Sequence, residues 1–109
     1  MGRVINMVAT ECQPEVEGKF NKWYNEIHIP MLFKNKGVDK VTRYKIRGKD
    51  GEFPTYLAIY EFGSVAECQA YIDSQELADA RAEMKETWKN GGWEIKWRLQ
   101  YEEIKTWQK

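Results

Sequence analysis

The chain has 109 residues, no net formal charge, 42% hydrophobic and 31% charged residues. This length predicts one domain over residues 1–109, and the lack of a basic excess argues against nucleic-acid binding. Its apolar runs fall short of the roughly 20 residues of a membrane span, and its N-terminus lacks the apolar core of a signal peptide. Cys12 and Cys68 match no metal or disulfide pattern. We therefore expect a cytoplasmic protein with both cysteines as packing residues.

The first predicted elements are a strand and an amphipathic helix. Residues 3–10 are apolar on both faces, which indicates a central strand, with Asn6 as its polar interruption. Apolar residues then recur at helical spacing over residues 16–31, and residues 31–36 are expected to add one more turn. Because Pro30 disfavours helical backbone at the residue before it, we expect this helix to end near His28.

Two strands and a helical region follow. Residues 38–47 and 55–62 are predicted strands, and the turn-forming residues between them predict a hairpin. Alternation in the first of these strands places Tyr44 on the inward face and Arg43 on the face toward solvent or a partner subunit. Residues 64–88 contain two helix-capping signals, so two helices are expected there.

Residues 93–104 form the last predicted strand, followed by a tail that is mobile or packs through Trp107. Five large apolar side chains alternate along this strand and are predicted to share one face: Trp93, Ile95, Trp97, Leu99 and Tyr101. The element order predicts a ferredoxin-like α+β fold, β-α-β-β-α-β, with a four-stranded antiparallel sheet and helices on one face. The other face would expose apolar side chains unless a second copy covered it, which predicts a homodimer.

Residues 23–30, Trp-Tyr-Asn-Glu-Ile-His-Ile-Pro, are similar to the helix-end W-Y-x-x-x-H-x-P pattern of the EthD-like branch of the dimeric α/β-barrel superfamily. Residues 56–62 and the capped helix after them also resemble that branch. The resemblance implies a dimeric α/β barrel with a small-molecule pocket between sheet and helices. The superfamily includes cofactor-free monooxygenases, cyclases, isomerases, dehydratases and haem-binding enzymes, so the fold alone does not choose the reaction.

The motif marks His28, the only histidine, as the candidate catalytic residue. Its imidazole can exchange a proton near neutral pH, which suits a general acid or base. The alternative is a structural histidine that bonds the last carbonyl groups of a helix. Side chains expected to contact substrate, each of which also suits a plain core position, are Asn6, Trp23, Tyr24, Tyr44, Tyr60, Tyr71 and Trp88. The sequence has no nucleotide fingerprint or metal cluster, so no cofactor or metal is expected.

Three functions remain open on the sequence. The first is a cofactor-independent isomerase, cyclase, decarboxylase or monooxygenase that acts on a small aromatic or enolisable substrate through His28. The second is a non-catalytic dimeric ligand-binding or accessory domain, in which Phe20, Trp23 and Trp88 fill the pocket and His28 bonds to backbone. The third is haem binding with His28 as the axial ligand. None of these involves nucleic acid or a membrane.

Overall fold

The computed structural model describes residues 2–48 and 51–109, so Lys49 and Asp50 of the predicted hairpin lie outside the described residues. Its four strands are β1 (Val4–Cys12), β2 (Val38–Lys45), β3 (Tyr56–Phe62) and β4 (Trp93–Glu102). They form one sheet in the order β2-β3-β1-β4, with every neighbouring pair antiparallel. The central position predicted for the first strand is confirmed.

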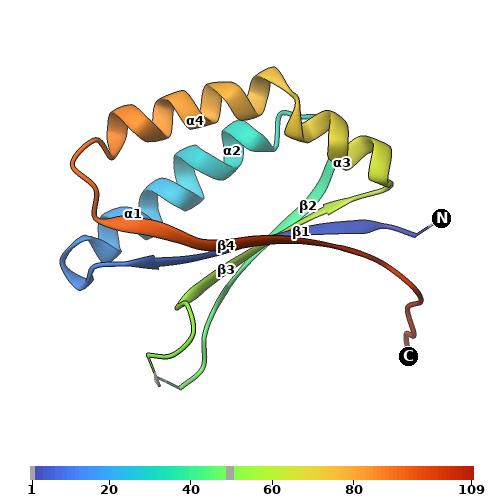
Figure 1. Cartoon of the computed structure of the whole chain (residues 1–109), viewed down its shortest axis with the longest axis horizontal. Helices are drawn as coiled ribbons and strands as arrows, with labels where there is room; N and C mark the ends of the chain where they lie inside the picture. The colour runs from blue at the N-terminus through green and yellow to red at the C-terminus, as the bar shows by residue number, and fades with distance from the viewer. Residues whose placement is uncertain (1, 49–50) are drawn as a thin grey trace.

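The helical segments all lie on one face of this sheet (Figure 1), which confirms the ferredoxin-like α+β fold. The segments are η1 (Pro14–Val16), α1 (Glu17–Trp23), η2 (Tyr24–His28), α2 (Ile29–Leu32), α3 (Val65–Ile72) and α4 (Gln75–Thr87). The side-chain oxygens of Ser64 and Ser74 accept hydrogen bonds from backbone N–H groups at the starts of α3 and α4. The division into two helices is as predicted, and so is the cap at Ser64. The second cap is Ser74, one residue after Asp73, with which the predicted capping box of residues 73–76 began.

The first helical segment does not end at His28, contrary to prediction. Residues 24–28 form a π-helical turn, in which the Ile29 N–H donates to the carbonyl oxygen of Tyr24, and α2 continues through Pro30 to Leu32. A proline inside an α-helix lacks a donor and crowds the carbonyl four residues earlier. The wider π turn relieves that crowding. His28 therefore lies inside a continuous helical segment, where it does not cap a helix end.

The register of β4 changes part-way along the strand. Ala9 lies opposite Trp97, but Thr10 lies opposite Ile95, so Lys96 is an extra residue on β4. Such a β-bulge moves the following side chains to the other face. Trp93 and Ile95 therefore pack against the core under the helices, while Trp97 and the apolar residues after it lie on the open face. The prediction that all five apolar residues share one face is wrong.

Strand β2 presents the opposite face from the one predicted. Arg43 lies opposite Ala58, which is buried under the helices, and Tyr44 lies opposite Leu57 on the open face. Tyr44 is 52% exposed. Alternation along a strand separates two faces, but the pairing with the next strand decides which of them is covered. Arg43 thus points toward the helices, and Tyr44 lies outside any helix–sheet site.

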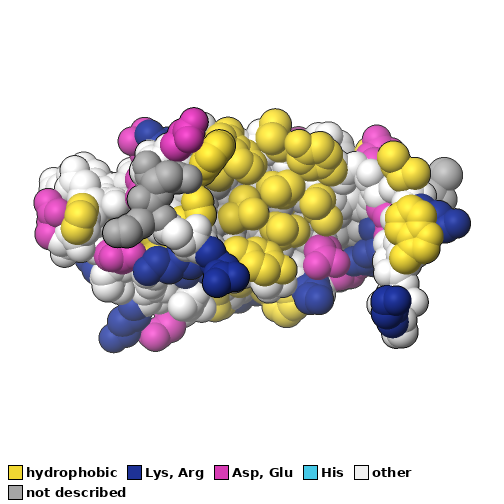
Figure 2. Space-filling model, turned by 90° about the horizontal axis from the view of Figure 1, so that it is seen from below, with side chains coloured by type: hydrophobic (Ala, Val, Ile, Leu, Met, Phe, Trp, Pro, Cys, Tyr) yellow, Lys and Arg dark blue, Asp and Glu magenta, His cyan; other side chains and the backbone are white. Residues whose placement is uncertain are grey.

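The open face of the sheet carries a continuous apolar patch (Figure 2). Its members come from all four strands: Ile5, Met7, Tyr44, Leu57, Ile59, Trp97, Leu99 and Tyr101. An apolar patch of this kind on a protein surface indicates an interaction site. None of the helices in the described part of the chain is long and apolar enough to cross a membrane.

Candidate functional site

His28 lies in the π turn and is buried, with 8% of its surface exposed. Its imidazole stacks on the indole of Trp23, with ring centroids 4.7 Å apart and planes 22° apart. The ring of Tyr24 meets it edge-on at 5.0 Å. The Nδ1 atom of His28 is enclosed and has no hydrogen-bond partner among the described residues. The candidate base therefore lies in an aromatic layer between the helices and the sheet.

Burial lowers the pKa of His28 to about 4, and the positive charge of Arg43 acts in the same direction. The carboxylate of Glu83 opposes this shift. At neutral pH the imidazole is therefore uncharged. An uncharged imidazole can accept a proton, but no imidazolium is present to donate one, so the resting side chain can serve as a general base and not as a general acid. The lowered pKa makes it a weaker base than a free imidazole.

Glu83 holds the indole on which His28 stacks. The Trp23 Nε1–H donates to both carboxylate oxygens of Glu83, at 3.0 and 3.2 Å, and the Thr87 hydroxyl hydrogen-bonds to the same carboxylate. Glu83 was not among the predicted site residues. The sequence did contain a signal for this residue. Glu83 lies beside Met84 on the inward stripe of α4, where a carboxylate needs a partner.

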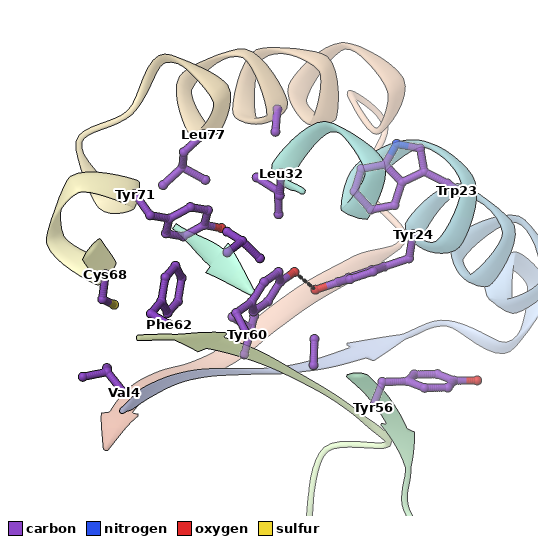
Figure 3. Close-up of a cluster of buried hydrophobic side chains, with 14 of the residues drawn as sticks. Val4, Trp23, Tyr24, Leu32, Tyr56, Tyr60, Phe62, Cys68, Tyr71 and Leu77 are labelled. Atoms are coloured by element: carbon purple, nitrogen blue, oxygen red, sulfur yellow. Dashed lines mark hydrogen bonds between the residues drawn. The ribbon is translucent and has the colours of Figure 1, made fainter. Parts of the chain in front are cut away.

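Three buried tyrosines from η2, β3 and α3, namely Tyr24, Tyr60 and Tyr71, meet between the helices and the sheet (Figure 3). The hydroxyls of Tyr24 and Tyr60 lie 3.2 Å apart and form a hydrogen bond. The ring of Tyr71 stacks against that of Tyr60, with centroids 6.3 Å apart. Burial raises the pKa of all three phenols, so they remain protonated and can donate hydrogen bonds.

Arg43 brings a positive charge into this layer. Its guanidinium carbon lies 4.4 Å from the ring centroid of Tyr24 and 5.3 Å from that of Tyr56. Its Nη1 donates to the Asn25 side-chain oxygen at 2.9 Å, whereas its Nη2 is enclosed and without a partner in the described chain. Burial lowers the pKa of Arg43, but guanidinium groups stay charged in proteins. Sequence analysis considered Arg43 and placed it on the wrong face.

The structure brings most of the predicted site residues to the helix-facing side of the sheet. Buried there are Asn6, Trp23, Tyr24, Tyr60, Tyr71 and Trp88, and only Tyr44 lies elsewhere. The rings of Phe20, Trp23 and Trp88 contact one another, with centroid separations of 5.8 to 6.4 Å. Of these rings, Trp23 stacks on His28, and the Nδ1 atom of His28 is enclosed. A ligand would therefore reach this nitrogen only after side chains move.

The site does not suit a haem or a metal ion. A haem would have to lie directly in front of a ring nitrogen of its axial histidine, and the Nδ1 atom of His28 is enclosed by the protein. Among residues 2–48 and 51–109, no group of three histidine, cysteine or acidic side chains could hold a metal ion. Cys12 and Cys68 are free thiols whose pKa is raised by burial, which makes them weak nucleophiles.

Comparison with known families now adds to this geometry. Residues 3–102 match the family described as "Domain of unknown function (DUF4286)". The chain belongs to the DUF4286 family. No curated protein matches it.

Solved structures resemble this DUF4286 chain over nearly its whole length. An ethyl tert-butyl ether d (EthD) family protein from Bacillus halodurans C-125 superposes with a TM-score of 0.68 at 15% identity, covering 95% of this chain and 100% of that one. A DABB family protein with a ferredoxin-like fold from Mesorhizobium loti superposes with a TM-score of 0.67 at 14% identity, covering 97% of this chain and 99% of that one. A dimeric ferredoxin-like protein of unknown function from Jannaschia sp. CCS1 superposes with a TM-score of 0.60 at 18% identity, covering 90% of this chain and 98% of that one. These likenesses confirm the ferredoxin-like fold, and one of the similar structures is that of an EthD family protein.

Proposed function

We propose that this chain is a cofactor-independent enzyme in which His28 acts as a general base on a small aromatic or enolisable substrate. The observation that carries the proposal is the enclosed, unpartnered and uncharged Nδ1 of His28. A buried polar atom left without a partner costs about 1–3 kcal/mol. Such atoms need an explanation in a folded protein, and a catalytic role is one.

The proposed reaction begins with proton transfer. Nδ1 of His28 takes a proton from an acidic C–H or phenolic O–H group, and the electron pair stays on the substrate as an enolate or phenolate. The positive charge of Arg43 and the phenol groups of Tyr24 and Tyr60 would stabilise the negative oxygen. Return of the proton to a different carbon gives an isomerisation. Attack of the carbanion on a carbonyl carbon of the same substrate gives a cyclisation: the C–C bond forms as the C=O π bond breaks, and the resulting alkoxide takes the proton back from His28. Trp23, Tyr71, Trp88 and Asn6 would form the remaining walls.

A hydrogen–deuterium exchange assay tests this proposal without a known substrate. Aryl ketones with an acidic C–H group are incubated with the protein in D2O, and the loss of the C–H signal is followed by NMR. We expect catalysed exchange that His28→Gln reduces about 100-fold, in the range of general-base effects. Glu26→Gln, on an exposed residue of the same π turn, is the matched control. Undiminished exchange in His28→Gln would contradict the proposal.

A non-catalytic binding or accessory domain is the second candidate. The mutual contacts of Phe20, Trp23 and Trp88 favour it, because they fill the space where a substrate would lie. In that case ligand binding would shift the indole fluorescence while His28→Gln left every assayed reaction unchanged.

We also propose that two copies associate through their open sheet faces. The apolar patch on that face supports this arrangement, since a second copy is the simplest way to remove it from water. The relative from Jannaschia sp. is described as dimeric. Sedimentation of the purified protein across a concentration series tests the proposal, with a dimer as the expected species.

A further inference from the structure

The tail after β4 carries two apolar side chains with almost no contact to their own chain. Ile104 is 99% exposed and Trp107 is 78% exposed. The start of the tail is nevertheless held in place. The Glu103 N–H donates to the carbonyl oxygen of Arg3 at 2.7 Å, and the Arg3 N–H donates to the Glu103 carboxylate at 3.2 Å. These bonds direct the tail away from the sheet on its open side (Figure 1).

An apolar hollow of about 220 Å³ lies at the opposite end of the same face. It forms where β2 and β3 run into their connection, and its apolar lining includes Tyr44, Ile46, Phe53, Pro54, Leu57 and Trp97. Figure 1 shows the β2–β3 connection and the tail projecting on the same side of the sheet, at opposite ends. Figure 2 shows the apolar patch between them.

We infer that Ile104 and Trp107 of each copy dock into this hollow of a second copy. The inference rests on the proposed sheet-to-sheet homodimer and specifies its geometry. In this dimer the two-fold axis lies parallel to the sheets and exchanges their two ends. Each tail then lies over the hollow of the partner copy, so the same contact is made twice. The other axis parallel to the sheet would bring tail against tail and hollow against hollow, so neither tail would reach a hollow.

The charges at the two ends are compatible with this docking. Glu11, Glu52 and Lys96 line a depression that adjoins the hollow and shares Phe53 and Trp97 with it. Lys96 is paired with Glu94, and Lys45 at the hollow is paired with Glu17. The tail carries Lys105 and Lys109 on either side of Trp107. Docking would bring these two lysines near the carboxylates of Glu11 and Glu52. Opposite charges on two surfaces favour their association, whereas like charges oppose it.

Dilution of the purified protein measures the contribution of the tail. We expect Trp107→Ala and Phe53→Ala each to weaken dimerisation at least tenfold, because a tryptophan seated in an apolar hollow is a typical hot spot. The double variant should weaken it by much less than the product of the two effects. Gln108→Ala, also on an exposed tail residue, is the matched control and should leave the dissociation constant unchanged.

Equal dissociation constants for the wild type, Trp107→Ala and Phe53→Ala would overturn tail docking while leaving the sheet-to-sheet dimer intact. A protein that is monomeric at every concentration would overturn both. Neither result depends on the deuterium-exchange assay of His28, so failure of the proposed chemistry is distinguished from failure of the docking.

Photo-crosslinking identifies the partner of the tail directly. A copy with Trp107→benzoylphenylalanine is mixed with 15N-labelled wild-type protein, irradiated and digested. We expect crosslinks from the probe to labelled peptides that contain Phe53 to Leu57. Crosslinks to labelled tail peptides would show the tail-to-tail arrangement and contradict the inference.

Discussion

The imidazole of His28 stacks on the indole of Trp23 with ring centroids 4.7 Å apart, and the indole N–H is bonded to the carboxylate of Glu83. An acidic side chain on α4 thereby sets the position of the ring beside the candidate base. Because His28 is the only histidine, its NMR signals can be assigned without ambiguity. This makes its ionisation a direct probe of the site.

The first prediction concerns the dependence of stability on pH. The pKa of His28 is about 4 in the folded protein and about 6.5 when unfolded. Below pH 6.5 the unfolded chain binds a proton that the folded chain does not, so the free energy of unfolding falls as pH falls. The loss continues until about pH 4 and reaches up to about 3 kcal/mol. Urea unfolding at pH 7.5 and 4.5 should show a smaller difference in His28→Gln than in the wild type.

The second prediction concerns Glu83→Gln. The amide oxygen still accepts from the indole N–H of Trp23, but the negative charge that raises the pKa of His28 is lost. We therefore expect the pKa of His28 to fall below its wild-type value, as measured by NMR titration. Glu86→Gln, an exposed carboxylate on the same helix, serves as the control. A His28 pKa that is unchanged in Glu83→Gln would argue against this electrostatic coupling.

The third prediction concerns the hydroxyl pair of Tyr24 and Tyr60. Tyr24→Phe leaves the buried hydroxyl of Tyr60 without its partner, which should lower the free energy of unfolding by about 1–3 kcal/mol. Removing both hydroxyls should cost less than the sum of the single changes. Urea unfolding of the four members of this cycle measures the difference. Additive losses would mean that the two hydroxyls do not stabilise each other.

The fourth prediction concerns Arg43→Met. Loss of the guanidinium should raise the pKa of His28, because the positive charge of Arg43 lowers it. If Arg43 also stabilises a negative oxygen in the substrate, the deuterium-exchange rate should fall about 100-fold. Arg43→Lys, which keeps the charge, should restore part of the rate. A normal rate together with a shifted His28 pKa would show that the charge of Arg43 acts on His28 and not on the substrate.

Much of the fold could be predicted from local patterns. The alternation in β3 and the helical stripe from Leu77 to Trp88 are set by which side chains avoid water, and the cap at Ser64 is a local hydrogen bond. The motif around His28 likewise identified the helix that carries the candidate base. The register of β4 could not be predicted, because the bulge at Lys96 depends on pairing with β1.

The sequence by itself determined the order of the elements, the ferredoxin-like fold and the one imidazole available for acid–base chemistry. Only the tertiary structure decided that Arg43 lies inside and Tyr44 outside, and that Glu83 joins the site. Periodicity sorts side chains onto faces within one element. Strand pairing and helix packing then choose which face is buried, and they depend on residues distant along the chain. Strand pairing and helix packing therefore also create the buried environment that keeps His28 uncharged at neutral pH.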